Sequence, residues 1–422
     1  MRIGEPGLGA RALFPSEAAF RALQQPHRGA PRGWCRCARG FKMETPPRFA
    51  ARLAYVAQDG ALLLRLPGLP WLTPFLVSLL LCAGLALTPA QTEAAYAATE
   101  LARLAEGSSQ VVRAANDADE IVGSAERGGR HRGFLLKGGP LQEIGGLPGS
   151  DYTAALGINN LGQVVGSANT ATGVRAFRSR RTTGIVALGT LPGDSGSVAL
   201  AINHPGQAVG YSSGPTGFRA VVWTPEGAIQ ALPMLPDCDS SRGLAINDGG
   251  DVVGVCDTAS GRRAVLWEGG AVQDLGTLPG DTSSEALSIN ANGLIVGSSG
   301  DPEAKHHAVL WPSGGGPIQD LGTLPDGTWS RALAINQRRE VVGISESRAG
   351  IHAFLWTERD GMQDLNELLA LRSGFVLIQA VAINARGVIV AIGVDEATSP
   401  EQGHDHDDHE LPLRIFRLVP GP

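Results

Sequence analysis

The sequence is poor in charged and aromatic side chains, which make up 18% and 5% of its 422 residues. With 43% hydrophobic residues, it does not have the composition of a disordered chain. Residues 100–422 also lack a 3.6-residue apolar period, apart from a weak one near 366–371, which argues against a helical fold. What remains is a chain with 57 glycines, in which turn-forming residues separate short apolar segments. This pattern predicts an all-β fold.

Common catalytic motifs are missing as well. The sequence has no nucleophile elbow, no HExxH motif and no Ser/His/Asp set that departs from its repeats. Its Gly-rich LPGD segments precede no helix, so they are not phosphate-binding loops. Residues 1–90 carry a net charge of +7 and the remainder −13. An acidic body argues against sequence-independent binding to nucleic acid, which requires a positive surface.

The longest apolar run, Phe75–Leu87, is short for a membrane span and suits the core of a signal peptide. Small residues follow at Ala90 and again at Ala97, and we favour cleavage after Ala90. An uncleaved anchor and lipid attachment at Cys82 are the alternatives. Residues 1–42 fit no structural pattern, so the true start is expected at Met43 or later. We therefore expect a leader over 1–90, a spacer over 91–99 and an exported mature chain without a stable membrane span.

The mature part contains seven tandem repeats. Each has an asparagine after a small, apolar strand, and successive asparagines lie 43, 44, 44, 43, 46 and 48 residues apart. Seven residues after each of them comes a glycine, except in the last repeat, which has Ala391. The asparagines are Asn116, Asn159, Asn203, Asn247, Asn290, Asn336 and Asn384.

Each repeat predicts four short antiparallel strands, typified by ALAIN, VVG, HAFLW and QDLGTL segments with turn residues between them. Four strands in about 45 residues is the pattern of a β-propeller. The seventh repeat lacks its fourth strand, whereas Glu100–Leu104 aligns with the fourth strand at 274–278. We expect this N-terminal strand to complete the last blade of a seven-bladed β-propeller over 100–420. An open solenoid would need capping ends, and none is evident.

His352-Ala353-Phe354, with the AIN, VVG and DLGTLPG segments around it, resembles the bacterial HAF-repeat family of probable extracellular proteins. The resemblance covers about residues 100–420, although only one copy carries all three letters. It implies an extracellular repeat protein and no particular chemistry.

A basic residue opens the third strand of every repeat. Two interpretations stand: each residue locks its own blade by pairing with a carboxylate or carbonyl, or together they form a ring that binds an anionic ligand. The seven are Arg132, Arg175, Arg219, Arg263, His307, His352 and Arg414.

A His/Asp-rich tract at 403–410 interrupts the last repeat. Imidazole and carboxylate groups suit Zn²⁺ or a similar divalent metal, although a solvated polar loop explains the same composition. The candidate ligands are His404, Asp405, His406, Asp408 and His409.

The mature chain keeps two cysteines, Cys238 and Cys256, at the same end of one predicted hairpin. In an oxidising compartment they predict a disulfide, and two reduced thiols are the alternative.

These patterns favour an exported, non-enzymatic, monomeric propeller that binds or scaffolds an extracellular glycan or protein and no nucleic acid. A secreted hydrolase or lyase, metal-assisted through the His/Asp tract, is the alternative.

Overall fold

The computed structural model describes residues 95–103, 111–127, 130–180, 184–301, 305–370, 374–396 and 413–421. The predicted leader, Leu104 and the whole His/Asp tract lie outside these ranges. All regular elements within them are strands, and the described residues contain no helix that could cross a membrane.

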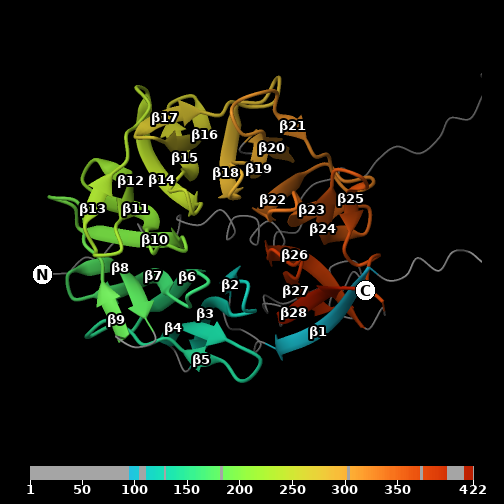
Figure 1. The fold of residues 1–422 in the computed structure, drawn as a ribbon, viewed down its shortest axis with the longest axis horizontal. Coiled ribbons are helices and arrows are strands. Elements are labelled where there is room, and N and C mark those ends of the chain that lie inside the picture. Colours follow the sequence, from blue (N-terminus) through green and yellow to red (C-terminus); the bar gives the residue numbers. More distant parts are fainter. Residues whose placement is uncertain are drawn as a thin grey trace, which may run out of the picture. The chain divides into compact units, whose positions relative to one another are not determined.

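Seven four-stranded antiparallel sheets surround a common axis, which confirms the predicted seven-bladed propeller (Figure 1). The first strands of successive blades contact one another nearest the axis. Blades 1 to 7 begin, respectively, with β2 (Val111–Ala115), β6 (Thr153–Ile158), β10 (Gly196–Ile202), β14 (Cys238–Ile246), β18 (Ser283–Ile289), β22 (Ser330–Ile335) and β26 (Phe375–Ile383).

The second strand of each blade carries the VVG segment. In blade order these are β3 (Ile121–Arg127), β7 (Val164–Thr170), β11 (Ala208–Gly214), β15 (Val252–Thr258), β19 (Ile295–Gly300), β23 (Val341–Ser347) and β27 (Ile389–Asp395). The third strands are β4 (Arg130–Leu136), β8 (Gly173–Arg180), β12 (Gly217–Trp223), β16 (Gly261–Glu268), β20 (His306–Trp311), β24 (Gly350–Thr357) and β28 (Arg414–Pro420).

The outer strands are shorter. Blades 1 to 6 end with β5 (Gln142–Glu143), β9 (Gly184–Ala187), β13 (Ile229–Ala231), β17 (Ala271–Asp274), β21 (Gln319–Asp320) and β25 (Gly361–Asp364). Blade 7 is completed from the other end of the chain, because β1 (Tyr96–Arg103) pairs antiparallel with β28. Figure 1 shows these two segments side by side.

The closing strand β1 begins at Tyr96, so it includes the last four residues of the spacer expected over 91–99. The Tyr96 side chain is buried, and its burial raises the pKa of the phenol to about 12. Its backbone N–H donates to the carbonyl of Leu368 at 3.0 Å, and its carbonyl accepts from Ala370 at 3.0 Å. The closing strand is therefore anchored to blade 6 as well as to blade 7.

The repeated glycine of the second strand is explained by a bulge in the first. The β10–β11 pairing shifts register between Ala199 and Ala201, and each of the other six blades has a shift at the same place. A Cβ on Gly210 would lie 2.0 Å from the carbonyl oxygen of Val198, which no side chain tolerates. Blade 7, which has Ala391 here, has a second register shift directly before the first, between Leu377 and Gln379.

The repeated asparagines join one blade to the next. Asn203 Oδ1 accepts the N–H of Gln207 in its own turn, and its Nδ2 donates to the carbonyl of Asn247 at 3.0 Å. Six such bonds run from asparagine to asparagine around the axis. At the seventh junction Asn384 donates instead to Asp119 at 3.4 Å. The asparagine is thus part of the structural framework. We call the face of the ring that carries these asparagine turns the turn face.

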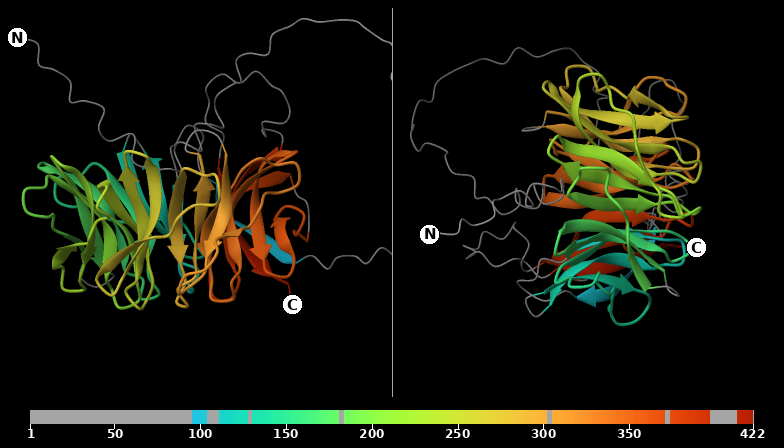
Figure 2. Two further views of the ribbon diagram at one scale, coloured as in Figure 1. Left: turned by 90° about the horizontal axis from the view of Figure 1, so that it is seen from above. Right: turned by 90° about the vertical axis from the view of Figure 1, so that its left-hand side faces the viewer.

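The opposite face carries the hairpins between second and third strands and the LPGD-type loops between blades. We call it the loop face; Figure 2 shows the ring edge-on, with connections on both sides. The hydrophobic core lies between neighbouring blades. The tryptophans of the third strands belong to it: Trp223, Trp267, Trp311 and Trp356 are all buried. Trp223 and Trp267 also donate their indole N–H groups to backbone carbonyls.

Candidate functional site on the loop face

The basic residues that open the third strands do not share one environment. Three of them pair with acidic side chains. His307 Nδ1 lies 3.0 Å from Asp320, and His352 Nδ1 lies 2.6 Å from Asp364. Arg414 bonds both Glu100 of the closing strand and Asp395, the latter at 2.7 Å. The Glu100 contact raises the pKa of Arg414, so this guanidinium stays charged. These three residues fix their own blades.

Arg175 is engaged with backbone groups. Its guanidinium donates to the carbonyls of Val174, at 3.0 Å, and of Ser195 in the next loop. Four of the seven basic residues are therefore bound to the protein itself. A continuous basic ring around the loop face, one of the two interpretations from the sequence, would need all seven to be accessible.

The other three are different. Arg219 and Arg263 have no hydrogen bond or ion pair within the described ranges, and Arg132 has a buried Nη1 atom without a partner there. Arg219 is exposed at the start of β12. In blade 3 the fourth-strand position that supplies the acid to His307 and His352 is Ala231, paired with Val221 in the same register. Blade 2 has Ala187 in this register as well, and blade 4 keeps Asp274 although Arg263 does not bond it, so the alanine alone does not decide whether the basic residue is paired.

Arg219 lines a hollow on the loop face of blade 3. Its walls come from the β11–β12 hairpin and from the loops before β10 and before β14, and its volume is 140 Å³. Ligand pockets for drug-sized molecules are typically 300 Å³ or more, so this hollow suits a small chemical group. Asp194, Asp239, Phe218 and Met234 also line it.

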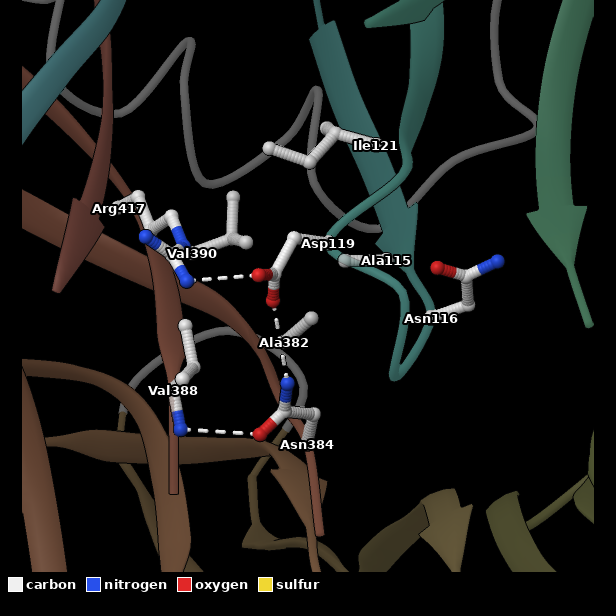
Figure 3. A pocket seen from close by; sticks show the side chains of 9 residues that line it. All are labelled: Ala115, Asn116, Asp119, Ile121, Ala382, Asn384, Val388, Val390 and Arg417. Carbon is white, nitrogen blue, oxygen red and sulfur yellow. Dashed lines mark hydrogen bonds and ion pairs between the residues drawn. The ribbon is translucent and has the colours of Figure 1, made fainter. Parts of the chain in front are cut away.

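A second hollow, shown in Figure 3, lies where blade 7 meets blade 1. It encloses 10 Å³, which is room for about one water molecule. Arg417 bonds Asp119 at 2.6 Å across its edge. This space is part of the ring's closure and too small for a ligand.

A charged cluster crosses blades 4 to 6. Arg242 bonds Asp257 at 2.6 Å, Arg262 bonds both Asp257 and Glu285, and Arg331 bonds the other oxygen of Glu285. Burial raises the pKa of Glu285, but Arg331 and Arg262 together outweigh it and hold that pKa below the usual value. The cluster is therefore one network of ion pairs that joins three arginines to two carboxylates.

His306, at the start of β20, lies beside this cluster. Its ring centroid is 5.3 Å from that of Trp329 in the next blade. Burial, and then the charge of Arg331, lower the pKa of His306 below its usual value, although Glu285 acts in the opposite direction. The imidazole is therefore neutral at pH 7. The sequence signal for this sector is the residue five before each asparagine: Val111, Ala154, Val198, Arg242, Glu285, Arg331 and Gln379.

Cys238 and Cys256 form a disulfide, with their Cα atoms 5.7 Å apart. In blade 5 the same two positions are Asp281 and Ser299, which share a 2.7 Å hydrogen bond. The disulfide thus replaces a loop-to-strand hydrogen bond of the repeat. It holds the loop that carries Asp239 to the second strand of blade 4.

Several predicted or functional residues remain to be placed. The candidate metal ligands His404, Asp405, His406, Asp408 and His409 lie outside the described residues. Within the described ranges no group of three or more His, Cys, Asp or Glu side chains is arranged to hold a metal. Sequence reasoning missed Asp194 and Asp239, and Ala231 does not mark blade 3, because blade 2 has Ala187 in the same register.

Comparison with known proteins finds distant structural similarity only. No family model matches the sequence, and no curated protein does. Among solved structures, a streptogramin B lyase is 12% identical with a TM-score of 0.49, over 78% of this chain and all of that one. Virginiamycin B lyase from Staphylococcus aureus is 12% identical with a TM-score of 0.46, over 77% and 98%. A puromycin-hydrolyzing peptidase of Mycobacterium tuberculosis is 15% identical with a TM-score of 0.45, over 76% and 54%. The seven-bladed architecture of this chain rests on its own seven four-stranded sheets.

Proposed function

We propose that this chain is an exported, non-enzymatic propeller that binds an extracellular glycan or protein through its loop face. The observation that carries the proposal is Arg219, an exposed guanidinium that has no partner within the described residues and lines a hollow. Arg263, at the same position of the next blade, has no partner there either. An Arg side chain with all its donors available is a strong site for a carboxylate or phosphate group.

Export is supported by two features. The apolar run Phe75–Leu87 and the small residues up to Ala90 form a signal-peptide pattern. Cleavage after Ala90 leaves the closing strand whole, whereas cleavage after Ala97 removes the buried Tyr96. The Cys238–Cys256 disulfide suits an oxidising compartment. This agrees with the proposed membership of the HAF-repeat family.

The test compares the natural protein with an Arg219→Gln, Arg263→Gln double variant on arrays of acidic glycans and of extracellular proteins. We expect the double variant to bind its partners on the arrays at least ten-fold more weakly, while its melting temperature stays the same. The matched control is Arg338→Gln, because Arg338 is an exposed arginine on the turn face. Unchanged binding by a double variant that melts normally would overturn the proposal.

A secreted hydrolase or lyase is the second candidate. It is favoured by the asymmetry of the ring, in which charged first-strand residues gather in blades 4 to 6 and His306 is neutral beside them. A neutral imidazole can act as a general base. A screen with chromogenic esters, glycosides and lactones tests this candidate, and turnover that His306→Ala abolishes would establish it over the binding role.

A further inference from the structure

The hollow of blade 3 contains charges of both signs that do not pair with one another. Arg219, Asp194 and Asp239 all line it, yet no ion pair joins Arg219 to either carboxylate. None of the three side chains makes a hydrogen bond to any described residue. The arginine and the two carboxylates therefore remain available to a ligand, and a ligand that carries one positive and one negative group is complementary to them.

The same loop positions are engaged in other blades. Asp281, the counterpart of Asp194, accepts a hydrogen bond from Ser299 at 2.7 Å. Thr328, the counterpart of Asp239, bonds Glu346 through its hydroxyl at 2.6 Å. The two carboxylates of the blade 3 hollow thus lack the hydrogen bonds that their counterparts make in blades 5 and 6.

The walls of the hollow are held in position. Phe218 packs against Tyr211 with ring centroids 5.2 Å apart, and the Arg242 guanidinium lies 5.1 Å from the centre of its ring. The Cys238–Cys256 disulfide tethers the neighbouring loop, which carries Asp239. A site with fixed walls loses little side-chain entropy when a ligand binds.

We propose that this hollow binds a small zwitterion, namely a free α-amino acid or a dipeptide. Arg219 receives the carboxylate through paired N–H donors, and Asp194 and Asp239 receive the ammonium group. Phe218 and Met234 contact the apolar part of the ligand. The inference rests on the proposed binding role of the loop face and assigns this hollow a ligand of its own, because a purely anionic chain would meet two carboxylates here.

The experiment is calorimetric titration of the full chain with alanine, alanylalanine, N-acetylalanine and alanine methyl ester. The first two carry both charges and the last two carry one each. We expect the better of the zwitterions to bind at least ten-fold more tightly than either singly charged analogue, and which one that is separates amino acid from dipeptide. Arg219→Gln should weaken this binding at least ten-fold, whereas Arg338→Gln, on the turn face, should not change it.

A second variant acts on the opposite wall. A Cβ on Gly214 would overlap the carboxylate of Asp194, so Gly214→Ala moves that carboxylate and should weaken binding of the zwitterion with little change in melting. No saturable binding by either zwitterion, or equal binding of N-acetylalanine, would overturn the inference. If array binding still depends on Arg219 in that case, the proposed function stands without the zwitterion site. If neither the arrays nor the zwitterions bind, both the proposed function and this inference are wrong.

Discussion

The turn face and the loop face repeat with the same period but behave differently. On the turn face the repeated asparagine makes the same bond to the next blade at six of seven junctions. On the loop face the repeated basic residue meets a carboxylate in blades 5 to 7, carbonyls in blade 2 and, among the described residues, no partner in blades 3 and 4. A residue type that recurs in every repeat therefore has the same role in each blade only if its bonding partner recurs as well.

The largest effect is expected where the loop face carries a covalent bond. Replacing both Cys238 and Cys256 by Ala should lower the free energy of unfolding by about 3 kcal/mol, because the bond closes a chain segment of 18 residues. Urea unfolding without reductant measures this. Cys238→Asp with Cys256→Ser copies the hydrogen-bonded pair of blade 5 and should recover part of the loss. An alanine variant as stable as the natural protein would show that the bond contributes nothing.

On the turn face, Asn203→Ala should lower the free energy of unfolding by about 2 kcal/mol, because it leaves the N–H of Gln207 without its acceptor and removes the bond to the carbonyl of Asn247, which keeps only the N–H of Gly250. Chemical denaturation provides the measurement. The matched control is Asn292→Ala, since that exposed side chain in the turn of blade 5 makes no hydrogen bond to a described residue. If both variants lose the same free energy of unfolding, the asparagine bonds between blades do not contribute to stability beyond an ordinary turn residue.

The pH dependence of the loop face is expected to be smaller. Because the pKa of His306 is lower in the folded protein, the unfolded chain binds more protons as pH falls below about 6.5. The contribution of this group to stability is therefore present above pH 6.5 and decreases towards the lower folded pKa. His306→Gln should flatten the dependence of the unfolding free energy on pH between about 5 and 6.5. An unchanged slope would mean that the imidazole titrates normally.

The smallest effect is expected for Arg263→Gln, which should change the free energy of unfolding by less than about 0.5 kcal/mol, as for surface positions without partners. The same denaturation experiment checks it. A loss well above this value would mean that Arg263 is structural after all, like its counterpart His352.

The seven blades and their closure could be predicted because both depend on local pattern: a strand, a turn and a fixed period from Asn116 to Asn384. The bulge opposite Gly210 could not be predicted, because it depends on how the backbones of the two paired strands are aligned. The site could be predicted only in part. Arg219 was one of seven equal candidates, and what distinguishes it is the hollow that it lines with residues of neighbouring segments, which only the folded chain brings together.

The closing strand also sets the order in which the molecule can be assembled. β1 is among the first of the strands to be synthesised, but its partner β28 follows about three hundred residues later. Contacts so distant in sequence form slowly, because the intervening chain must first be brought together. Blades 1 to 6 are built from neighbouring hairpins and can form as the chain emerges. Until blade 7 arrives, Tyr96–Arg103 is an unpaired edge that a second chain could capture, so sealing the ring also protects the protein from aggregation.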